Sequence, residues 1–212
     1  MKKNEELLKI YKKIKKDIVN RIKEFKRNGK NMTDNEILYE LFFCLLTPQS
    51  KATLCWSSVE KIKKEGEKIL KEKEKIKSCL YGVRFPNNKS KYIHHFYNEK
   101  FLKEKFFQEL KNIESNFEKR EFLVKNVKGM GYKEATHFLR NIGYGNDLAI
   151  LDRHILKNLK EYSIIKNIPS SISRKRYIEI EEDMRKFSKK LDIPLENLDF
   201  VLWYKERGFI FK

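Results

Sequence analysis

Apolar residues recur at helical spacing along most of this chain, and the residues that interrupt helices are scarce. Only 8 Gly and 4 Pro occur in 212 residues, and strand-like alternation is rare. Between residues 5 and 26 the apolar side chains share one helical face while lysines fill the other. The apolar members are Leu7, Leu8, Tyr11, Ile14, Ile18, Ile22 and Phe25. The sequence therefore predicts an all-α protein.

Local signals divide this pattern into separate helices. The stretch 28–31 predicts a break after the first helix, and Thr33 with Glu36 forms a capping box that predicts a buried helix ending near Leu46. Phe85 precedes a proline, which favours an extended backbone at that residue. Further helices are expected at 51–64, 90–98, 101–113, 119–126, 169–190 and 194–204.

The charge balance indicates a polyanionic partner. The chain has 48 Lys and Arg against 30 Asp and Glu, which gives a formal net charge of +18. Charged residues make up 37% of the chain, above the roughly 25% typical of soluble domains. Because 40% of the residues are apolar, the chain can still form a core. We therefore expect a folded protein that binds nucleic acid.

Several other classes are excluded. The longest apolar run, 41–46, falls far short of the roughly 20 residues that span a bilayer, and no apolar stretch follows the basic start. We expect an intracellular, cytoplasmic protein without membrane association. The three cysteines, Cys44, Cys55 and Cys79, lack C-x-x-C spacing. This argues against disulfides, a metal site and a cysteine-ligated iron–sulfur cluster.

The most informative segment is 127–133, in which Gly129 and Gly131 flank one apolar residue. Such a segment predicts a tight hairpin between two helices, because glycine adopts left-handed angles and lets another backbone approach closely. The next helix has the polar residues Lys133, His137 and Arg140 on one face. Its other face has an apolar stripe that would pack in the core, formed by Ala135, Phe138, Leu139 and Ile142. Free N–H groups at its start can hold a phosphate oxygen. An ordinary helix-turn-helix with a glycine cap is the alternative.

The elements around this hairpin resemble the helix-hairpin-helix DNA glycosylase superfamily. In that superfamily a lysine after the hairpin marks members that are both glycosylase and lyase, and an apolar segment leads to a catalytic aspartate. Lys133 and Asp152 match these positions and lie 152 − 133 = 19 residues apart. The resemblance implies two helical lobes with DNA in a cleft between them. Residues 29–146 would form the central lobe, and 1–28 with 147–212 the second.

Within the superfamily, the chain is most similar to the archaeal-type 8-oxoguanine DNA glycosylase/lyase family. The similarity rests on the length, the missing cluster cysteines, the segment 133–140 and the ending 202–212. It implies a monomer that removes 8-oxoguanine from double-stranded DNA and then nicks the strand, without a redox cofactor but with a monovalent ion at the hairpin carbonyls. A glycosylase for oxidised pyrimidines and a noncatalytic DNA-binding protein remain alternatives.

The resemblance assigns the chemistry to two residues. The neutral amine of Lys133 would attack the anomeric carbon and leave an imine, which permits β-elimination of the 3′ phosphate. Asp152 precedes a helical pattern, so it would cap that helix. Its fixed negative charge would also stabilise positive charge at the sugar.

The remaining candidates would bind the base and the duplex. A flipped base needs flat walls, for which Phe85 and Trp203 are candidates, with core packing as the alternative for each. The apolar residues 209–211 predict a packed chain end. The resemblance then places Lys212 at the base, where it would distinguish 8-oxoguanine from guanine. Gln49 would fill the gap in the duplex, although Pro48-Gln49 departs from the pattern of the most similar members. Gly129, Gly131 and His154 would contact the DNA backbone.

Overall fold

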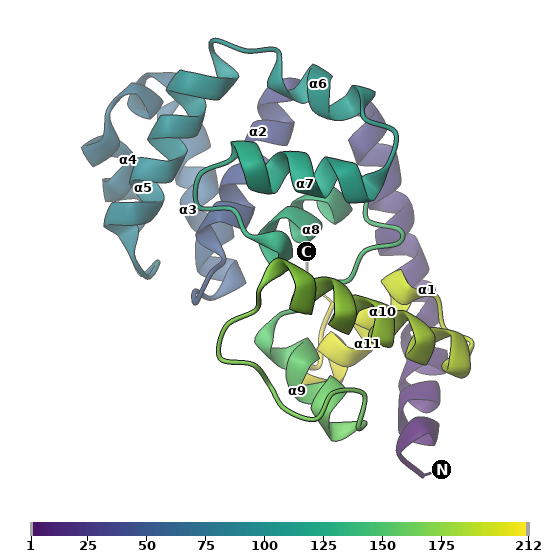
Figure 1. The fold of residues 1–212 in the computed structure, drawn as a ribbon. Helices are drawn as coiled ribbons and strands as arrows, with labels where there is room; N and C mark the ends of the chain where they lie inside the picture. Colours follow the sequence, from purple (N-terminus) through teal and green to yellow (C-terminus); the bar gives the residue numbers. More distant parts are fainter. Residues whose placement is uncertain (1, 211–212) are drawn as a thin grey trace. The chain divides into compact units, whose positions relative to one another are not determined.

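The computed structural model describes residues 2–210, and it is helical with no strand in that part of the chain (Figure 1). The expected all-α fold is confirmed. The α-helices are α1 (Lys2–Asn31), α2 (Asp34–Leu46), α3 (Ala52–Glu65), α4 (Lys73–Cys79), α5 (Pro86–His95), α6 (Phe106–Asn112), α7 (Asn116–Asn126), α8 (Tyr132–Asn141), α9 (Arg153–Glu161), α10 (Arg174–Leu191) and α11 (Leu195–Arg207). A 3-10 helix, η1 (Glu67–Lys71), and a π-helical turn, η2 (Phe96–Phe101), complete the order.

The chain separates into two compact units that are discontinuous in sequence. We call residues 31–139 the central unit, and residues 1–30 with 140–212 the terminal unit. The border after Leu139 falls inside α8, earlier than the end of the central lobe expected at residue 146. Among the described residues no helix combines the length and the apolar character needed to cross a membrane.

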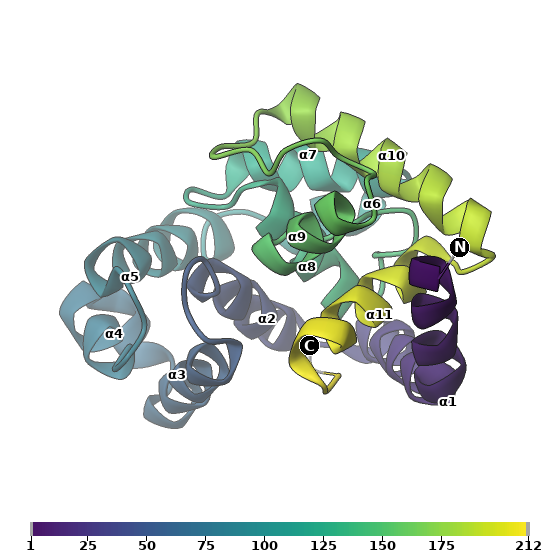
Figure 2. The same ribbon diagram turned by 90° about the horizontal axis from the view of Figure 1, so that it is seen from below.

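The central unit is built around α2. Both ends of the capping box are present, because Thr33 N donates to Glu36 Oε2 at 2.7 Å and Glu36 N donates to Thr33 Oγ1 at 3.3 Å. From Ile37 onward almost every residue of α2 is buried, so this helix lies inside its unit. Helices α3, α4 and α5 gather at one end of α2 (Figure 2). An aromatic cluster of Phe96, Phe106 and Phe107 fills the core beside them.

The first helix of the terminal unit is longer than expected. The predicted apolar face is buried apart from Leu8, which is half-buried. The predicted break at residues 28–31 is wrong, since α1 continues to Asn31. A Cβ at Gly29 would lie 1.9 Å from the carbonyl oxygen of Ile142. This glycine therefore serves a close approach between α1 and the segment after α8, and it does not end the helix.

Two further boundaries differ from the prediction. Helix α10 begins at Arg174 and not at Pro169, because Ser173 is its N-cap and accepts from the N–H of Arg176. Helix α11 extends to Arg207, where Gly208 takes a left-handed conformation and ends it.

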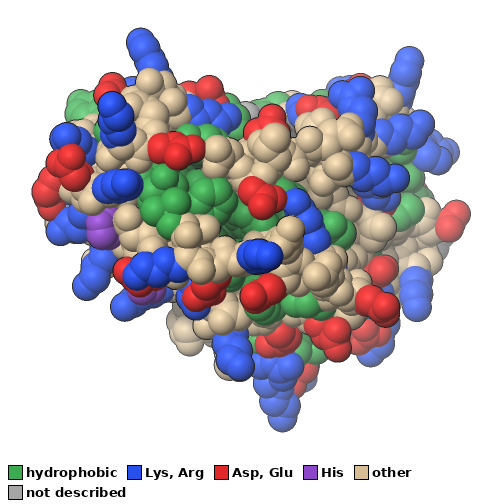
Figure 3. All heavy atoms as spheres, turned by 90° about the horizontal axis from the view of Figure 1, so that it is seen from above, with side chains coloured by type: hydrophobic (Ala, Val, Ile, Leu, Met, Phe, Trp, Pro, Cys, Tyr) green, Lys and Arg blue, Asp and Glu red, His purple; other side chains and the backbone are tan. Residues whose placement is uncertain are grey.

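Positive charge is spread over the surface. On the face shown in Figure 3, lysine and arginine side chains are interleaved with acidic ones and do not form a single stripe. Many of the ion pairs among the described residues lie three or four residues apart on one helix, such as Lys63 with Glu60 and Arg176 with Glu179. Exposed pairs of this kind contribute little to stability.

Candidate functional site

The hairpin between α7 and α8 forms as the glycine pattern predicts. Met130 N donates to the carbonyl of Val127 at 3.1 Å and closes the turn. Gly129 has a φ of 86°, in the left-handed region, and a Cβ there would lie 2.3 Å from the ring of Tyr92. Gly131 has no positive φ. The hairpin thus needs Gly129 both for its backbone angle and for its contact with Tyr92.

Helix α8 buries its apolar stripe, as expected. Ala135, Phe138 and Leu139 are fully buried. On the other face His137 is buried, whereas Lys133 and Arg140 are part-exposed. The His137 ring packs edge-on against Phe43 with centroids 5.4 Å apart, and Arg140 forms an ion pair.

The amine of Lys133 lies against the turn that follows α2. Its Nζ donates to the hydroxyl oxygen of Thr47 at 3.2 Å and lies 3.5 Å from a carboxylate oxygen of Glu134. The Thr47 hydroxyl in turn donates to the carbonyl of Cys44 at 2.9 Å. The Lys133 side chain is 22% exposed. The amine is therefore held in place yet remains accessible.

Gln49 projects from the same turn. Its φ of 54° lies in the left-handed region, which is unusual for a residue with a side chain, and its side chain is exposed. Ser50 N donates to the carbonyl of Thr47 at 3.0 Å and closes the turn around it. The turn therefore presents the Gln49 side chain at the surface, and its role in filling the duplex stays a prediction.

Phe85 occupies a second turn of the central unit, just before α5. The expected extended backbone is wrong, because Phe85 has φ 57° and ψ 47°. The residue still avoids the right-handed helical region, as a residue before proline should, but it takes the left-handed region instead. Its ring is 51% exposed and lies 5.8 Å below the guanidinium of Arg84. Core packing is therefore excluded for Phe85.

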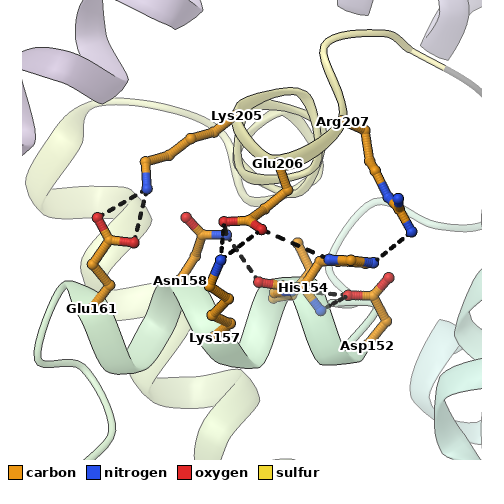
Figure 4. Close-up of polar contacts among 9 residues, drawn as sticks. Asp152, His154, Lys157, Asn158, Glu161, Lys205, Glu206 and Arg207 are labelled. Atoms are coloured by element: carbon orange, nitrogen blue, oxygen red, sulfur yellow. Dashed lines mark hydrogen bonds and ion pairs between the residues drawn. The ribbon is translucent and has the colours of Figure 1, made fainter.

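Asp152 caps α9 in the terminal unit, as predicted. One carboxylate oxygen accepts hydrogen bonds from the N–H groups of His154 and Ile155, both at 2.8 Å (Figure 4). The extended segment before it is fixed to α10, since Tyr177 Oη donates to the carbonyl of Ala149 at 2.6 Å and Glu181 accepts from Ala149 N at 2.8 Å. The chain around Asp152 is thus fixed on both sides, by the cap on α9 after it and by the contacts of Ala149 with α10 before it.

A polar network joins α9 to α11 beside this cap (Figure 4). The guanidinium of Arg207 lies 3.0 Å from His154 Nε2. Arginine can only donate, so Nε2 accepts in this contact, and Nδ1 faces Glu206 at 3.9 Å. Lys157 pairs with Glu206 at 3.0 Å, and this hydrogen bond holds the pKa of Glu206 below its usual value. His154 is thereby oriented at the start of α9.

Trp203 and the chain end give a mixed result. The Trp203 ring is half-buried and packs edge-on against His154 with centroids 5.4 Å apart. Its buried Nε1 has no hydrogen-bond partner within the described residues. The predicted packed chain end is wrong for Phe209, which is 47% exposed. Lys212 lies outside the described residues.

Two residues of the central unit were missed by the sequence analysis. Neither Thr47 nor Lys89 was predicted to take part in the site. A signal for Lys89 exists, since it lies four residues before the buried Ile93 and therefore shares the buried face of α5. Nothing local marks Thr47, because its partner Lys133 is 86 residues away.

The fold and the site together define a class. A helical protein in which a glycine hairpin leads into a helix bearing Lys133, and in which Asp152 caps a later helix, has the features of a helix-hairpin-helix DNA glycosylase. The model of the family described as 8-oxoguanine DNA glycosylase matches residues 18–193. The chain belongs to this family.

Individual relatives agree with this assignment. The 8-oxoguanine DNA glycosylase/AP lyase of Fusobacterium nucleatum is 46% identical over 221 aligned positions, which cover 100% of both chains. The crystal structure of the Methanocaldococcus jannaschii 8-oxoguanine glycosylase/lyase, in complex with a 15mer DNA containing 8-oxoguanine, gives a TM-score of 0.83 at 36% identity and covers 100% of both chains. The 8-oxoguanine DNA glycosylase of Thermotoga maritima gives 0.85 at 35% identity and covers 100% of this chain and 99% of its own.

Proposed function

We propose that this protein excises 8-oxoguanine from double-stranded DNA and then cleaves the strand at the abasic site through an imine on Lys133. The observation that carries the proposal is the Lys133 amine, held on Thr47 just after the hairpin and still accessible, in a chain that belongs to the 8-oxoguanine DNA glycosylase family. The relatives named above support the choice of lesion.

The reaction begins with the loss of a proton from Lys133. Glu134, at 3.5 Å, can accept that proton, and Thr47 keeps the nitrogen in place. The nitrogen then bonds to C1′ of the damaged nucleotide as the bond from C1′ to the base breaks, and the base leaves with a proton. The sugar ring opens to an imine between C1′ and Nζ. Loss of a C2′ proton expels the 3′ phosphate, and water releases the lysine.

Asp152 would stabilise the positive charge that builds up at the sugar. Two backbone N–H groups hold its carboxylate in place. A fixed negative charge in a site that excludes water stabilises developing positive charge strongly. The capping contact and the catalytic role are compatible, because the cap uses one of the two oxygens.

The duplex contacts complete the proposal. Gln49 would fill the space left by the flipped nucleotide, Phe85, Trp203 and Lys212 would recognise the base, and His154 with the hairpin backbone of Gly129 and Gly131 would hold phosphates. The protein would act as a monomer in the compartment that contains the chromosome. The positive net charge supports a DNA affinity that falls steeply with salt.

A monovalent cation at the hairpin also belongs to the proposal. Within the described residues, the carbonyl groups of Lys128, Gly129 and Met130 accept no backbone hydrogen bond, which fits their use as oxygen ligands. Such an ion would add positive charge for a phosphate contact.

Borohydride trapping tests the proposal. The wild type should give a covalent adduct on a duplex with 8-oxoguanine opposite cytosine, and Lys133→Gln should give none while still binding the duplex. Lys128→Gln, which changes an exposed lysine of the same hairpin, is the matched control and should still be trapped. Faster trapping on a thymine-glycol duplex would favour an oxidised-pyrimidine enzyme. Tight binding without any adduct would leave a noncatalytic DNA-binding protein.

A further inference from the structure

A buried lysine without an assigned role connects the two exposed turns of the central unit. Lys89 lies in the first turn of α5 and is 4% exposed. Its Nζ donates to the carbonyls of Leu46 and Pro48, both at 2.7 Å, and to Ser50 Oγ at 3.0 Å. An ammonium group has three donor hydrogens, so this set of acceptors is complete. Within the described residues Lys89 forms no ion pair with a carboxylate.

The three acceptors surround the residues that matter for the proposed reaction. Pro48 and Ser50 flank Gln49, whose left-handed backbone is strained for a residue with a side chain. Thr47, between Leu46 and Pro48, accepts the hydrogen bond from the Lys133 amine. Lys89 therefore fixes from inside the protein the same turn that Lys133 touches.

Lys89 also reaches the turn of Phe85. Its backbone N–H donates to the Phe85 carbonyl at 3.1 Å, and Ser50 Oγ, which accepts from the Lys89 ammonium, also accepts from the N–H of Arg84 at 3.0 Å. Two non-glycine residues with left-handed backbones, Gln49 and Phe85, are thus held by one cluster of hydrogen bonds centred on Lys89.

A charged side chain at this buried position is unfavourable for folding, because its ammonium group is removed from water. Burial, together with the positive charges of Lys133 and Arg84, lowers the pKa of Lys89 to about 8, while Cys55 and Glu134 act in the opposite direction. The Cys55 thiol beside it has a pKa raised to about 11 by burial, so it is neutral near pH 7. A methionine would fill a similar volume without desolvating a charge.

We infer that Lys89 is a positioning residue for the imine chemistry: its ammonium group locks the 46–50 turn so that Thr47 holds the Lys133 amine and Gln49 stays projected. Its charge also repels a second positive charge at Lys133. This inference rests on the proposed function, because it concerns the rate at which Lys133 forms the imine.

Lys89→Met tests the inference, with Lys91→Met as the matched control because it makes the same change at an exposed position of the same helix. The single-turnover rate of borohydride trapping is measured on a duplex with a preformed abasic site, from about pH 6 to about pH 9. Affinity for a duplex with a tetrahydrofuran abasic analogue is measured in parallel. At pH 7 we expect trapping by Lys89→Met to slow by about tenfold or more, with affinity changed by less than about threefold.

The pH profile separates positioning from a merely structural role. The hydrogen bonds from Lys89 to the turn are strongest while its amine is protonated, so the loss of trapping rate in Lys89→Met should depend on pH. The difference in trapping rate between the wild type and Lys89→Met should become smaller above about pH 8, where Lys89 of the wild type itself loses its proton. A deficit that follows the folded fraction and is equal at every pH would overturn the inference, as would trapping at the wild-type rate.

A second variant covers the case in which Lys89→Met fails to fold. Ser50→Ala removes one acceptor of the ammonium and the link to Arg84, and it should slow trapping by about threefold or more while the variant remains folded at the assay temperature. Unchanged trapping in Ser50→Ala overturns the inference in that case. If the wild type is trapped on the abasic duplex but not on 8-oxoguanine, the proposed lesion is wrong, and the comparison with Lys89→Met still decides the role of Lys89.

Discussion

The buried carboxyl group of Asp199 should make the stability of the protein fall as the pH rises from about 4 to about 6. Asp199 is 6% exposed, and its Oδ2 accepts from the Arg140 guanidinium at 2.6 Å. Burial raises the pKa of Asp199 to about 6 from an ordinary value of 3.8, although Arg140 acts in the opposite direction. The negative charge of Asp152 acts in the same direction as burial and contributes to this raised pKa.

The magnitude follows from this shift. Between pH 3.8 and about 6, the folded protein keeps a proton on Asp199 that the unfolded chain has lost. Stability contributed by this proton is present below the unfolded pKa and is lost as the pH rises through the folded one. The rise in the pKa of Asp199 from 3.8 to about 6 corresponds to a change of roughly 3 kcal/mol in the free energy of unfolding. Asp199→Asn cannot titrate, so this loss should disappear in the variant.

Urea denaturation at constant ionic strength, from about pH 4 to about pH 7, measures the effect. The unfolding free energy of Asp199→Asn is subtracted from that of the wild type, which cancels carboxyl groups with lowered pKa such as Glu206. Asp147→Asn, which removes an exposed carboxyl group of the same unit, is the control and should give a much smaller slope. A difference that stays flat or rises with pH would show that the attraction of Arg140 outweighs burial.

Three further predictions concern the cap and two glycines. Asp152→Asn keeps a capping side chain, so urea denaturation should show a change below about 1 kcal/mol. Its single-turnover excision should nevertheless fall by about 100-fold, and wild-type excision would leave Asp152 as a cap alone. Gly29→Ala should lose about 1–3 kcal/mol in thermal unfolding despite the better helix propensity of alanine, because its Cβ would lie 1.9 Å from the Ile142 carbonyl; a raised melting temperature would contradict this close approach. Gly129→Ala should weaken duplex binding in fluorescence anisotropy, since both its φ of 86° and the ring of Tyr92 oppose a side chain, and unchanged affinity would remove the hairpin from the interface.

The features that could be predicted from the sequence are those encoded within a few neighbouring residues. The capping box of Thr33 and Glu36, the left-handed Gly129 and the cap at Asp152 each depend on contacts no more than four residues apart. The buried stripe of α8 follows from helical periodicity alone. The all-α fold was predictable for the same reason.

The features that could not be predicted depend on partners far along the chain. Gly29 looked like a helix break because its neighbour Ile142 is distant in sequence, and only the close approach explains a glycine inside α1. Lys89 was one lysine among many until its ammonium was found on the carbonyl of Leu46, 43 residues away. Periodicity indicates which face of a helix is buried, but it does not identify the acceptors that a buried charge will meet.

The backbone of the central unit separates residues that support the fold from residues whose side chains serve another purpose. Gln49 and Phe85 both have exposed side chains on left-handed backbones, each of which costs about 1–2 kcal/mol. Neither side chain is buried, so folding gains little from them, and glycine would relieve the strain at both positions. The hydrogen bonds that offset this cost, at about 1 kcal/mol each, come from Lys89, Ser50 and the N–H of Arg84 beneath the turns. Here a buried charged residue holds two strained residues whose side chains are exposed. This arrangement is best explained by a ligand that those side chains contact. In this family that ligand is DNA.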